Sequence, residues 1–174
     1  MLKRTNPRDF DGVARFAAHH RATVANHEGA HSFYAHAWGL EIHELSTDYG
    51  PGTYGHVRLY AAPDDPRSGA ERARAVVVAL LAPAVLGFDD ERGTFDDLRS
   101  ARAAAVAFAP KGKVDEWLDD ARDAIRAYAK RPGVGKRFTK FVFWLGDDSR
   151  TIPGDDVYAY LVCHGSTHGA ALEP

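Results

Sequence analysis

The chain has 174 residues, of which 45% are hydrophobic and 26% are charged, so it has enough apolar material for the core of one globular domain. Its formal net charge of −2 provides no basic field, which argues against general binding to nucleic acid or to an acidic membrane surface. Its single cysteine, Cys163, excludes an internal disulfide, and no apolar run reaches the length of a membrane span. Because the N-terminus also lacks the apolar core of a signal peptide, we expect a cytoplasmic protein.

The first predicted element is a helix that begins near Asn6 and Pro7, with Asn6 as its cap and Pro7 at its first helical position. An Ala-rich segment follows and ends at Gly39, a residue type that commonly terminates helices. The pattern leaves open whether one helix runs through this region or breaks near His19 and His20.

The segment from His27 to His31 reads His-Glu-Gly-Ala-His, which is the H-E-x-x-H pattern. Residues four apart lie on the same face of a helix, so His27 and His31 can direct imidazole nitrogens at one metal ion. Glu28 lies about 100° around the helix, where a carboxylate can reach water at the metal without being a ligand. The pattern predicts one zinc ion per chain, with Glu28 as general base. A solvated or core-satisfied histidine pair is the alternative.

Two stretches of alternating hydrophobicity, residues 41–47 and 53–60, flank a Gly/Pro turn cluster at 49–52 and predict two strands joined by a loop. The second strand could run beside the cleft and pair with an extended substrate through main-chain hydrogen bonds. An ordinary half-exposed strand explains the same pattern. The residues that the first interpretation assigns to substrate binding are Tyr54, Gly55, His56 and Val57.

The next predicted helix covers residues 70–86 and is apolar on most sides, as a central core helix would be. Pro83 lies near its C-terminal end and removes a backbone donor, which predicts a kink. Gly87 then ends the helix.

A further helix is predicted to start near Thr94. Thr94 and Asp97, three residues later, together resemble a capping box. In the simplest interpretation Asp97 only caps this helix and Asp96 is solvated. Alternatively, one of the two completes the protein ligands of the metal, because a catalytic zinc site usually takes three and leaves one position open. A glutamate such as Glu71 is another candidate for the third ligand.

The order of the segments resembles the peptidase domain of FtsH-type ATP-dependent zinc metalloproteases. The motif from His27 to His31 comes first, followed by an extended region, a helix containing Pro83 and the segment around Asp97. The resemblance covers roughly residues 10–130 and lies in the order of the motifs rather than in close identity. In that family the third zinc ligand is an Asp just before an apolar residue near the start of a helix, which Asp97 matches.

The resemblance implies a fold, a set of ligands and an activity. The fold would be α+β, a mainly helical, zincin-like metallopeptidase domain with a small β-sheet. The zinc ligands would be His27, His31 and Asp97, and the catalytic base would be Glu28. The activity would be that of a zinc metalloendopeptidase, a hydrolase of peptide bonds.

This sequence departs from the family pattern in two respects. Gly29 precedes Ala30, whereas the family typically has Ala and then Gly at these positions. The sequence also contains no ATPase module and no membrane anchor. We therefore expect a stand-alone domain whose substrates are peptides or unfolded, flexible protein segments, cleaved without an ATPase of its own.

The C-terminal part begins after a predicted helix over residues 114–128. Residues 137–145 and 157–163 are rich in aromatic and β-branched residues and predict two strands around an Asp/Gly/Pro-rich loop. The expected organisation is a peptidase-like domain over residues 1–135 and a C-terminal β extension over residues 136–174, packed on the same domain.

Other interpretations start from the same C-terminal region. Lys136, Arg137 and Lys140 alternate with aromatic residues and could clamp single-stranded nucleic acid, although lysines that protect a sheet edge are the commoner explanation. A catalytically silent, metallopeptidase-like module that binds a protein partner is a further alternative, but it would not need Glu28. A homo-oligomer is compatible with the sequence.

Cys163 and His164, together with His168, provide metal-ligating side chains for a second site. No fourth ligand is evident, and Gly165 and Gly169 argue for a flexible end.

Overall fold

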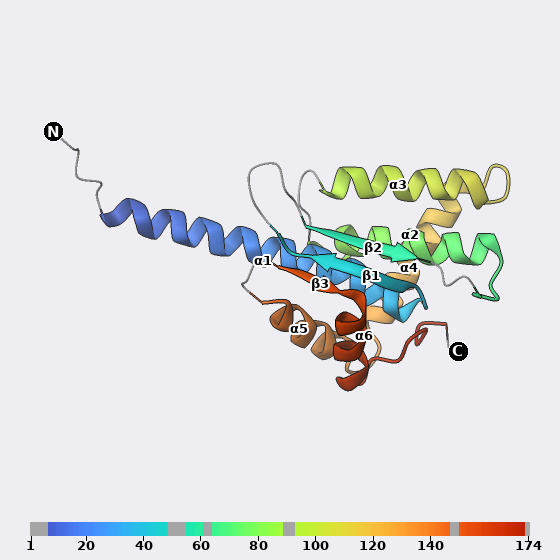
Figure 1. Ribbon diagram of the computed structural model, residues 1–174. Coiled ribbons are helices and arrows are strands. Elements are labelled where there is room, and N and C mark those ends of the chain that lie inside the picture. The colour runs from blue at the N-terminus through green and yellow to red at the C-terminus, as the bar shows by residue number, and fades with distance from the viewer. Residues whose placement is uncertain (1–6, 49–54, 61–63, 89–92, 147–149, 173–174) are drawn as a thin grey trace.

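The computed structural model describes residues 7–48, 55–60, 64–88, 93–146 and 150–172, and in the first helix it describes side chains from Ala22 onwards. Within these residues the chain forms six helices and three strands (Figure 1). In chain order these are α1 (Pro7–Ala37), β1 (Glu41–Ser46), β2 (His56–Tyr60), α2 (Gly69–Leu86), α3 (Gly93–Phe108), α4 (Val114–Ala129), α5 (Val134–Leu145), β3 (Thr151–Pro153) and α6 (Gly154–Cys163). The predicted α+β class, mainly helical with a small sheet, is confirmed.

The three strands form one antiparallel sheet in the order β2-β1-β3. Leu45 in the central strand pairs with Val57 of β2 on one side and with Ile152 of β3 on the other. Leu45 is fully buried, so the middle of the sheet belongs to the core. In the described residues β2 has a strand on one side only, which makes it an edge strand.

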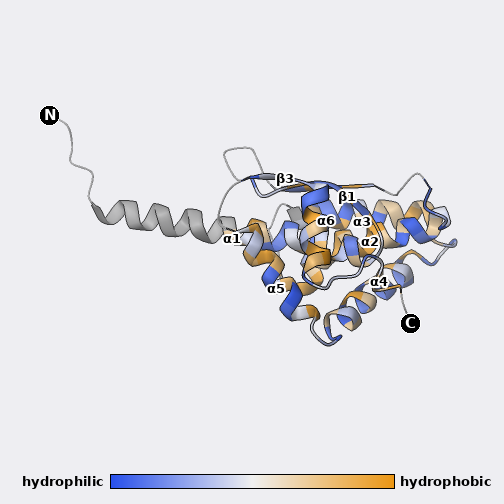
Figure 2. Cartoon of the chain, turned by 60° about the horizontal axis from the view of Figure 1, so that its bottom comes forward, coloured by the Kyte–Doolittle hydropathy of each residue, from blue (hydrophilic) through white to orange (hydrophobic). Residues whose placement is uncertain are grey.

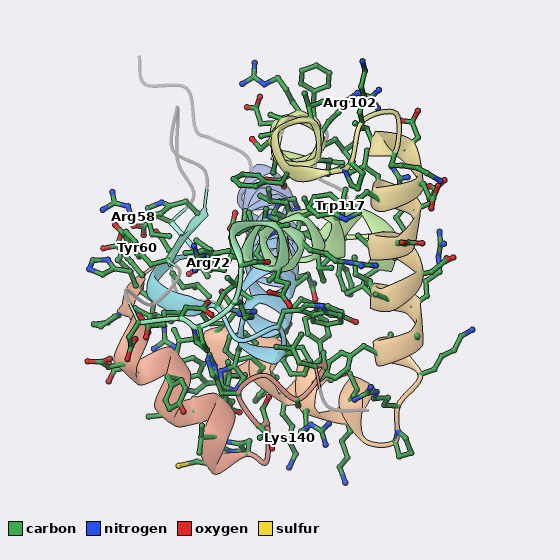
Figure 3. All side chains as sticks on the ribbon, turned by 90° about the vertical axis from the view of Figure 1, so that its right-hand side faces the viewer. Arg58, Tyr60, Arg72, Arg102, Trp117 and Lys140 are labelled. Carbon is green, nitrogen blue, oxygen red and sulfur yellow. The ribbon has the colours of Figure 1, made fainter. Side chains whose placement is uncertain are left out.

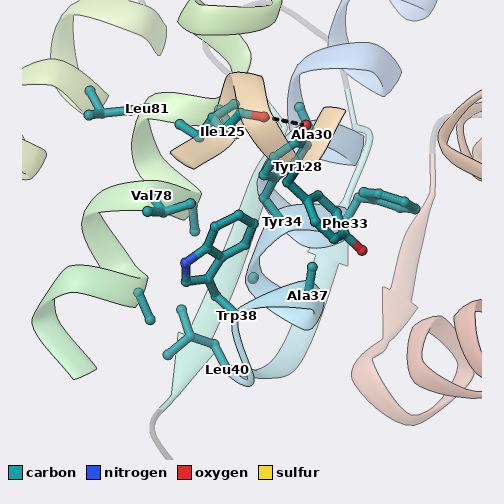
Figure 4. Packing of buried hydrophobic residues seen from close by; sticks show 14 of the residues in the cluster. Ala30, Phe33, Tyr34, Ala37, Trp38, Leu40, Val78, Leu81, Ile125 and Tyr128 are labelled. Carbon is teal, nitrogen blue, oxygen red and sulfur yellow. Dashed lines mark hydrogen bonds between the residues drawn. The ribbon is translucent and has the colours of Figure 1, made fainter. Parts of the chain in front are cut away.

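The C-terminal half of α1 is the centre of the molecule, because it contacts α2, α5, β1 and β2. Its buried aromatic residues pack closely with one another, and Figure 4 shows Phe33, Tyr34 and Trp38 within the apolar cluster. The rings of Tyr34 and Trp38 stack with centroids 5.7 Å apart, and the Tyr34 hydroxyl reaches the carbonyl of Ile125 at 3.5 Å. Large buried rings of this kind dominate core energetics, so α1 is held rigidly along this half.

The structure answers the question of a helix break near His19 and His20, because α1 is continuous from Pro7 to Ala37. It ends in a Schellman motif, in which the amide of Gly39 donates to the carbonyl of His36 and the amide of Leu40 to that of Ala35. Gly39 has a φ of +69°, a conformation that residues with a Cβ rarely adopt. The predicted stop at Gly39 is therefore confirmed.

The second helix, α2, is bounded by two well-defined caps. Ser68 and Glu71 form a reciprocal capping box at its start. Its end is a second Schellman motif, with the amides of Gly87 and Phe88 donating to the carbonyls of Ala84 and Pro83. The predicted bounds and the position of Pro83 inside the helix are confirmed.

The two predicted C-terminal strands are wrong, because residues 137–145 lie in α5 and residues 157–163 lie in α6. Only Thr151–Pro153, between them, is a strand. The predicted domain boundary after residue 135 falls in the first turn of α5, a helix that contacts α1.

The physical reason for this difference is the spacing of the buried residues. Val134, Phe141 and Leu145 lie on one face of α5, and Val157 and Leu161 lie one turn apart on α6. Figure 2 shows the resulting mixture of hydrophobic and hydrophilic faces on the helices. Packing against α1 and β1 overrides the local preference of aromatic and β-branched residues for strands.

No helix in the described part of the chain has both the length and the apolar character that a membrane crossing requires.

The packing of α6 on the sheet predicts a strong effect of Gly154→Ala. A Cβ at Gly154 would lie 1.6 Å from the carbonyl oxygen of Ile42, so the backbones of α6 and β1 would have to separate. We expect the free energy of unfolding, measured in urea, to fall by about 2–3 kcal/mol. Gly135→Ala is the control, because no atom lies within 4 Å of its Cβ position and Ala favours helix by up to about 1 kcal/mol. Equal stability of Gly154→Ala and the wild type would contradict the described packing.

Candidate metal centre

Three side chains from two helices meet at one point beside the centre of α1. His27 and His31 come from α1 and are almost completely buried, with relative exposures of 4% and 6%. Asp97 comes from the N-terminal part of α3. Its Oδ2 atom lies 3.0 Å from the Nε2 atom of each histidine, and the two Nε2 atoms are 3.1 Å apart. Among the described residues, this is the only group of three or more such side chains with convergent ligand atoms.

Main-chain carbonyls in the C-terminal half of α2 and just beyond its end hold the two imidazole rings. The Nδ1 atom of His31 lies 2.8 Å from the carbonyl oxygen of Ala79, and the Nδ1 atom of His27 lies 3.1 Å from that of Phe88. Because a carbonyl can only accept, each Nδ1 carries the hydrogen, and each neutral ring presents its Nε2 lone pair to the site. Metal-ligating histidines typically have this kind of supporting hydrogen bond.

The local structure of α2 explains why both carbonyls are free to accept. A proline has no amide hydrogen, so Pro83 makes no helical hydrogen bond to the carbonyl four residues earlier, which is that of Ala79. The Schellman motif at Gly87 uses the amide of Phe88 and places its carbonyl beyond the last turn. The sequence predicts only a kink at Pro83. In the structure, Pro83 also leaves the carbonyl of Ala79 free to accept the hydrogen bond from His31.

The donor set fits a metal ion. With both rings neutral, two nitrogen lone pairs and one carboxylate oxygen face one another with no hydrogen between them, an arrangement that needs a positive charge at its centre. Ligand atoms bonded tetrahedrally at about 2.0–2.1 Å are roughly 3.3 Å from one another, close to the observed spacing. The group of His27, His31 and Asp97 could therefore hold a metal ion, and these residue types accept several divalent metals.

The pKa values of His27 and Asp97 also show that a positive charge between the three groups is favoured. Burial alone would lower the pKa of His27, but its hydrogen bond to Asp97 and the nearby carboxylate charges outweigh burial and raise it. Burial alone would raise the pKa of Asp97, but the close contacts with the His27 and His31 rings lower it to about 2. Without a metal, a proton is drawn to the point where the three ligand atoms meet.

Asp97, and not Asp96, is the acidic residue that the structure brings to the histidine pair. The side chain of Asp96 is 68% exposed and forms an ion pair with Arg99 at 3.2 Å. Glu71, the other candidate for a third ligand, accepts a hydrogen bond from the amide of Ser68 in the capping box of α2. These contacts engage both carboxylates away from the two histidines, although Asp96 also lines the cavity beside them.

Glu28 lies in the same cavity as the three convergent groups but is not one of them. Its relative exposure is only 7%. Burial raises the pKa of its carboxyl group, and the neighbouring His31 and His27 reduce this shift only in part. A buried carboxylate with a raised pKa, next to the ligand group, is suited to accept a proton.

The edge strand β2 forms one wall of this cavity, which has a volume of about 370 Å³. Gly55, His56 and Val57 all line it, whereas Tyr54 lies outside the described residues. The alternation along β2 leaves Arg58 and Tyr60 exposed on the outer side of the sheet, where Figure 3 labels them. Three of the four predicted substrate-binding residues therefore border the candidate site.

Gly55 has a role that the sequence pattern did not reveal. A Cβ at this position would lie 2.6 Å from the Cγ atom of Glu28 and 2.8 Å from the carbonyl oxygen of Ser46. Only glycine therefore allows the chain to pass so close to the Glu28 side chain. A glycine next to a strand often marks a close approach of this kind, and this was the available signal.

The predicted cluster of Cys163, His164 and His168 does not form. The Nδ1 atom of His164 is bonded to the carbonyl of Tyr160 at 2.9 Å, and its ring stacks on the Tyr160 ring. Cys163 is exposed, and the His168 ring instead faces the ring of His36, with centroids 5.1 Å apart.

The helical structure of α5 turns two of the three aromatic residues of the cation-rich segment away from its exposed lysines. Phe138 contacts Phe33 and Phe88, and Phe141 is fully buried. Lys140 is exposed and lies at the periphery in Figure 3. Two of the three aromatic residues of the nucleic-acid interpretation therefore belong to the core, whereas Phe143 is 87% exposed, and that interpretation stays a prediction.

No protein-family model matches the chain, and no curated protein sequence matches it. The description of the site consequently rests on the geometry of this chain itself.

The first prediction from this geometry concerns the third ligand. Asp97→Ala removes one of the three convergent atoms, and we expect it to lose the Zn²⁺ ion held at this point, measured by equilibrium dialysis as one ion fewer per chain than in the wild type. Asp96→Ala is the matched control on the neighbouring residue and should bind as the wild type does. Loss of metal in Asp96→Ala, with retention in Asp97→Ala, would reverse the assignment.

The second prediction concerns Pro83. Pro83→Ala supplies an amide that competes with His31 for the carbonyl of Ala79, so we expect the affinity for Zn²⁺ to fall by about 10-fold. The metal-free protein should unfold at the same or higher urea concentration, because Ala is a far better helix former than Pro. Pro132→Ala, at an exposed position between α4 and α5, is the control for general effects of proline removal. Unchanged zinc affinity in Pro83→Ala would show that this hydrogen bond does not support the site.

Proposed function

We propose that this protein is a zinc-dependent metalloendopeptidase that hydrolyses peptide bonds in peptides or flexible protein segments. The observation that carries the proposal is the combination of three convergent ligand atoms with a buried glutamate beside them that is not itself a ligand. Three protein ligands that leave one position open are typical of catalytic zinc sites. The predicted resemblance to the peptidase domain of FtsH-type metalloproteases agrees in the identity and order of these residues.

Zinc suits this donor set because two imidazoles and one carboxylate are frequent ligands of catalytic zinc. His27, His31 and Asp97 would hold the ion. When bound there, zinc supplies Lewis-acid chemistry that polarises water and the carbonyl group of the scissile bond. The hydrogen bonds from the Nδ1 atoms to main-chain carbonyls fix the tautomer and the orientation of each ring, so that Nε2 faces the ion.

Glu28 would perform the proton transfers. Its carboxylate is placed to take a proton from the attacking water and to pass it to the nitrogen of the leaving amine. Burial raises its pKa, which makes the carboxylate a stronger base than one in water. Gly55 keeps space for this side chain against β2. The burial of Glu28 thus has a chemical use that a binding-only module would not require.

The substrate would lie along β2. The outer edge of this strand carries no neighbouring strand in the described residues, so its main-chain groups can pair with an extended peptide. Gly55, His56 and Val57 would provide these contacts at the cavity wall. A folded protein does not present an extended strand in this way, so peptides and flexible segments are the expected substrates.

Glu28→Gln separates the enzyme from a catalytically silent binding module. The amide has nearly the same shape but cannot act as a base, so we expect zinc to be retained and peptide hydrolysis to fall by at least about 100-fold. Hydrolysis is measured with a fluorogenic peptide library, and metal content is measured on the same samples. Glu71→Gln is the matched control, since glutamine also completes a capping box at that position. A Glu28→Gln variant as active as the wild type would refute the proposed mechanism.

A further inference from the structure

A second pair of histidines meets at another face of α1, where His36 of this helix lies beside His168 of the C-terminal segment. His36 has a relative exposure of 1%, and neither of its ring nitrogens has a hydrogen-bond partner in the described part of the chain. The backbone of Ser166 lies beside the ring but outside hydrogen-bond geometry. The Nδ1 atom of His168 is also buried and has no partner there. A buried polar group without a partner costs about 1–3 kcal/mol, so three such nitrogens on two neighbouring rings require an explanation.

The two rings have nearly the mutual arrangement of the first histidine pair. The centroids of His36 and His168 are 5.1 Å apart with an interplanar angle of 64°, compared with 4.8 Å and 81° for His27 and His31. Two imidazoles bound tetrahedrally to one metal at about 2.0–2.1 Å have centroids roughly 5 Å apart. The ring separation therefore allows both side chains to bind one ion after small rotations.

A cavity of about 350 Å³ connects these rings to acidic side chains. It is lined by His36, His168 and Tyr158, and also by the carboxylate-bearing residues Glu41 and Asp155. Burial lowers the pKa of His168, and the charge of Glu41 acts in the opposite direction, which places that carboxylate within electrostatic range of the ring. Burial and the neighbouring His168 lower the pKa of His36 to about 4, so its ring is neutral near pH 7 and has a lone pair to offer.

The position of His168 is set by main-chain hydrogen bonds that are independent of its ring. The amide of Gly169 donates to the carbonyl of His36 at 3.0 Å, and the amide of Ala171 donates to that of Ala37 at 2.9 Å. Arg131 in turn donates to the carbonyl of Ala170. The C-terminal segment is thus attached across the end of α1, and it carries His168 to the buried face of His36.

We propose that His36 and His168, with Glu41 as the carboxylate ligand, form a second site for a divalent transition-metal ion that ties the C-terminal segment to α1. Imidazole and carboxylate ligands suit zinc, and imidazole also suits copper and nickel. Among the described residues only the first site has three ligand atoms already assembled, so Glu41 turns inward when the ion binds. The site is structural, since a metal clip between distant segments stabilises the folded state by its binding free energy.

The test is the stoichiometry of Co²⁺ binding to the metal-free full chain, measured by equilibrium dialysis with elemental analysis. We expect two ions per chain for the wild type and one for His168→Ala. His164→Ala is the matched control, because it lies in the same segment with its ring stacked on Tyr160, and it should still bind two. Saturation of the wild type at one ion that His168→Ala retains, or two ions bound by His168→Ala, would overturn the second site.

The Asp97→Ala variant distinguishes this inference from the proposed function. It should bind one Co²⁺, and that ion should raise its melting temperature, whereas the double variant Asp97→Ala/His168→Ala should show neither effect. If Asp97→Ala binds no metal while the wild type binds one, the second site is absent and the first remains. If the wild type binds one ion that is lost in His168→Ala and kept in Asp97→Ala, the second site stands and the first falls.

Discussion

The candidate centre depends on two hydrogen bonds, from the Nδ1 atoms of His27 and His31 to main-chain carbonyls in the C-terminal half of α2 and just beyond its end. Each bond determines which ring nitrogen carries the hydrogen and thereby leaves the other with a lone pair that could bind a metal ion. The acceptors are not incidental, because Pro83 leaves the carbonyl of Ala79 without a helical partner and the Schellman motif at Gly87 places the carbonyl of Phe88. The end of one helix is thus shaped to orient two side chains of another.

The rest of the fold is arranged around the helix that carries these histidines. Asp97 arrives from α3, which packs on α2, so the third ligand and the two carbonyls belong to one connected unit. On the opposite wall β2 passes so close to Glu28 that only Gly55 fits. A Cβ at Gly29 would lie 3.1 Å from side-chain atoms of both Val142 and Leu145, so the unusual glycine within the motif is explained by the contact with α5. Rigid surroundings of this kind are what a preorganised site needs.

The sequence predicted the parts of this site that are local and missed those that depend on distant main-chain groups. The H-E-x-x-H pattern identified three side chains, and the resemblance identified Asp97, because both rest on residue types at fixed spacings. The acceptors for His31 and His27 lie 48 and 61 residues away in sequence and are carbonyl groups, which every residue possesses. The aromatic and β-branched residues of 137–145 favour a strand locally, but packing against α1 decides their helical form.

The most direct test of the account is anomalous X-ray diffraction at the zinc absorption edge, from crystals of the full chain grown with Zn²⁺. The account predicts a peak about 2.0–2.1 Å from the Nε2 atoms of His27 and His31 and from a carboxylate oxygen of Asp97, with Glu28 nearby but not bonded to the ion. Zinc found elsewhere in the crystal with no peak among these three residues would contradict it, and the histidine pair would then be part of the core and not a metal centre.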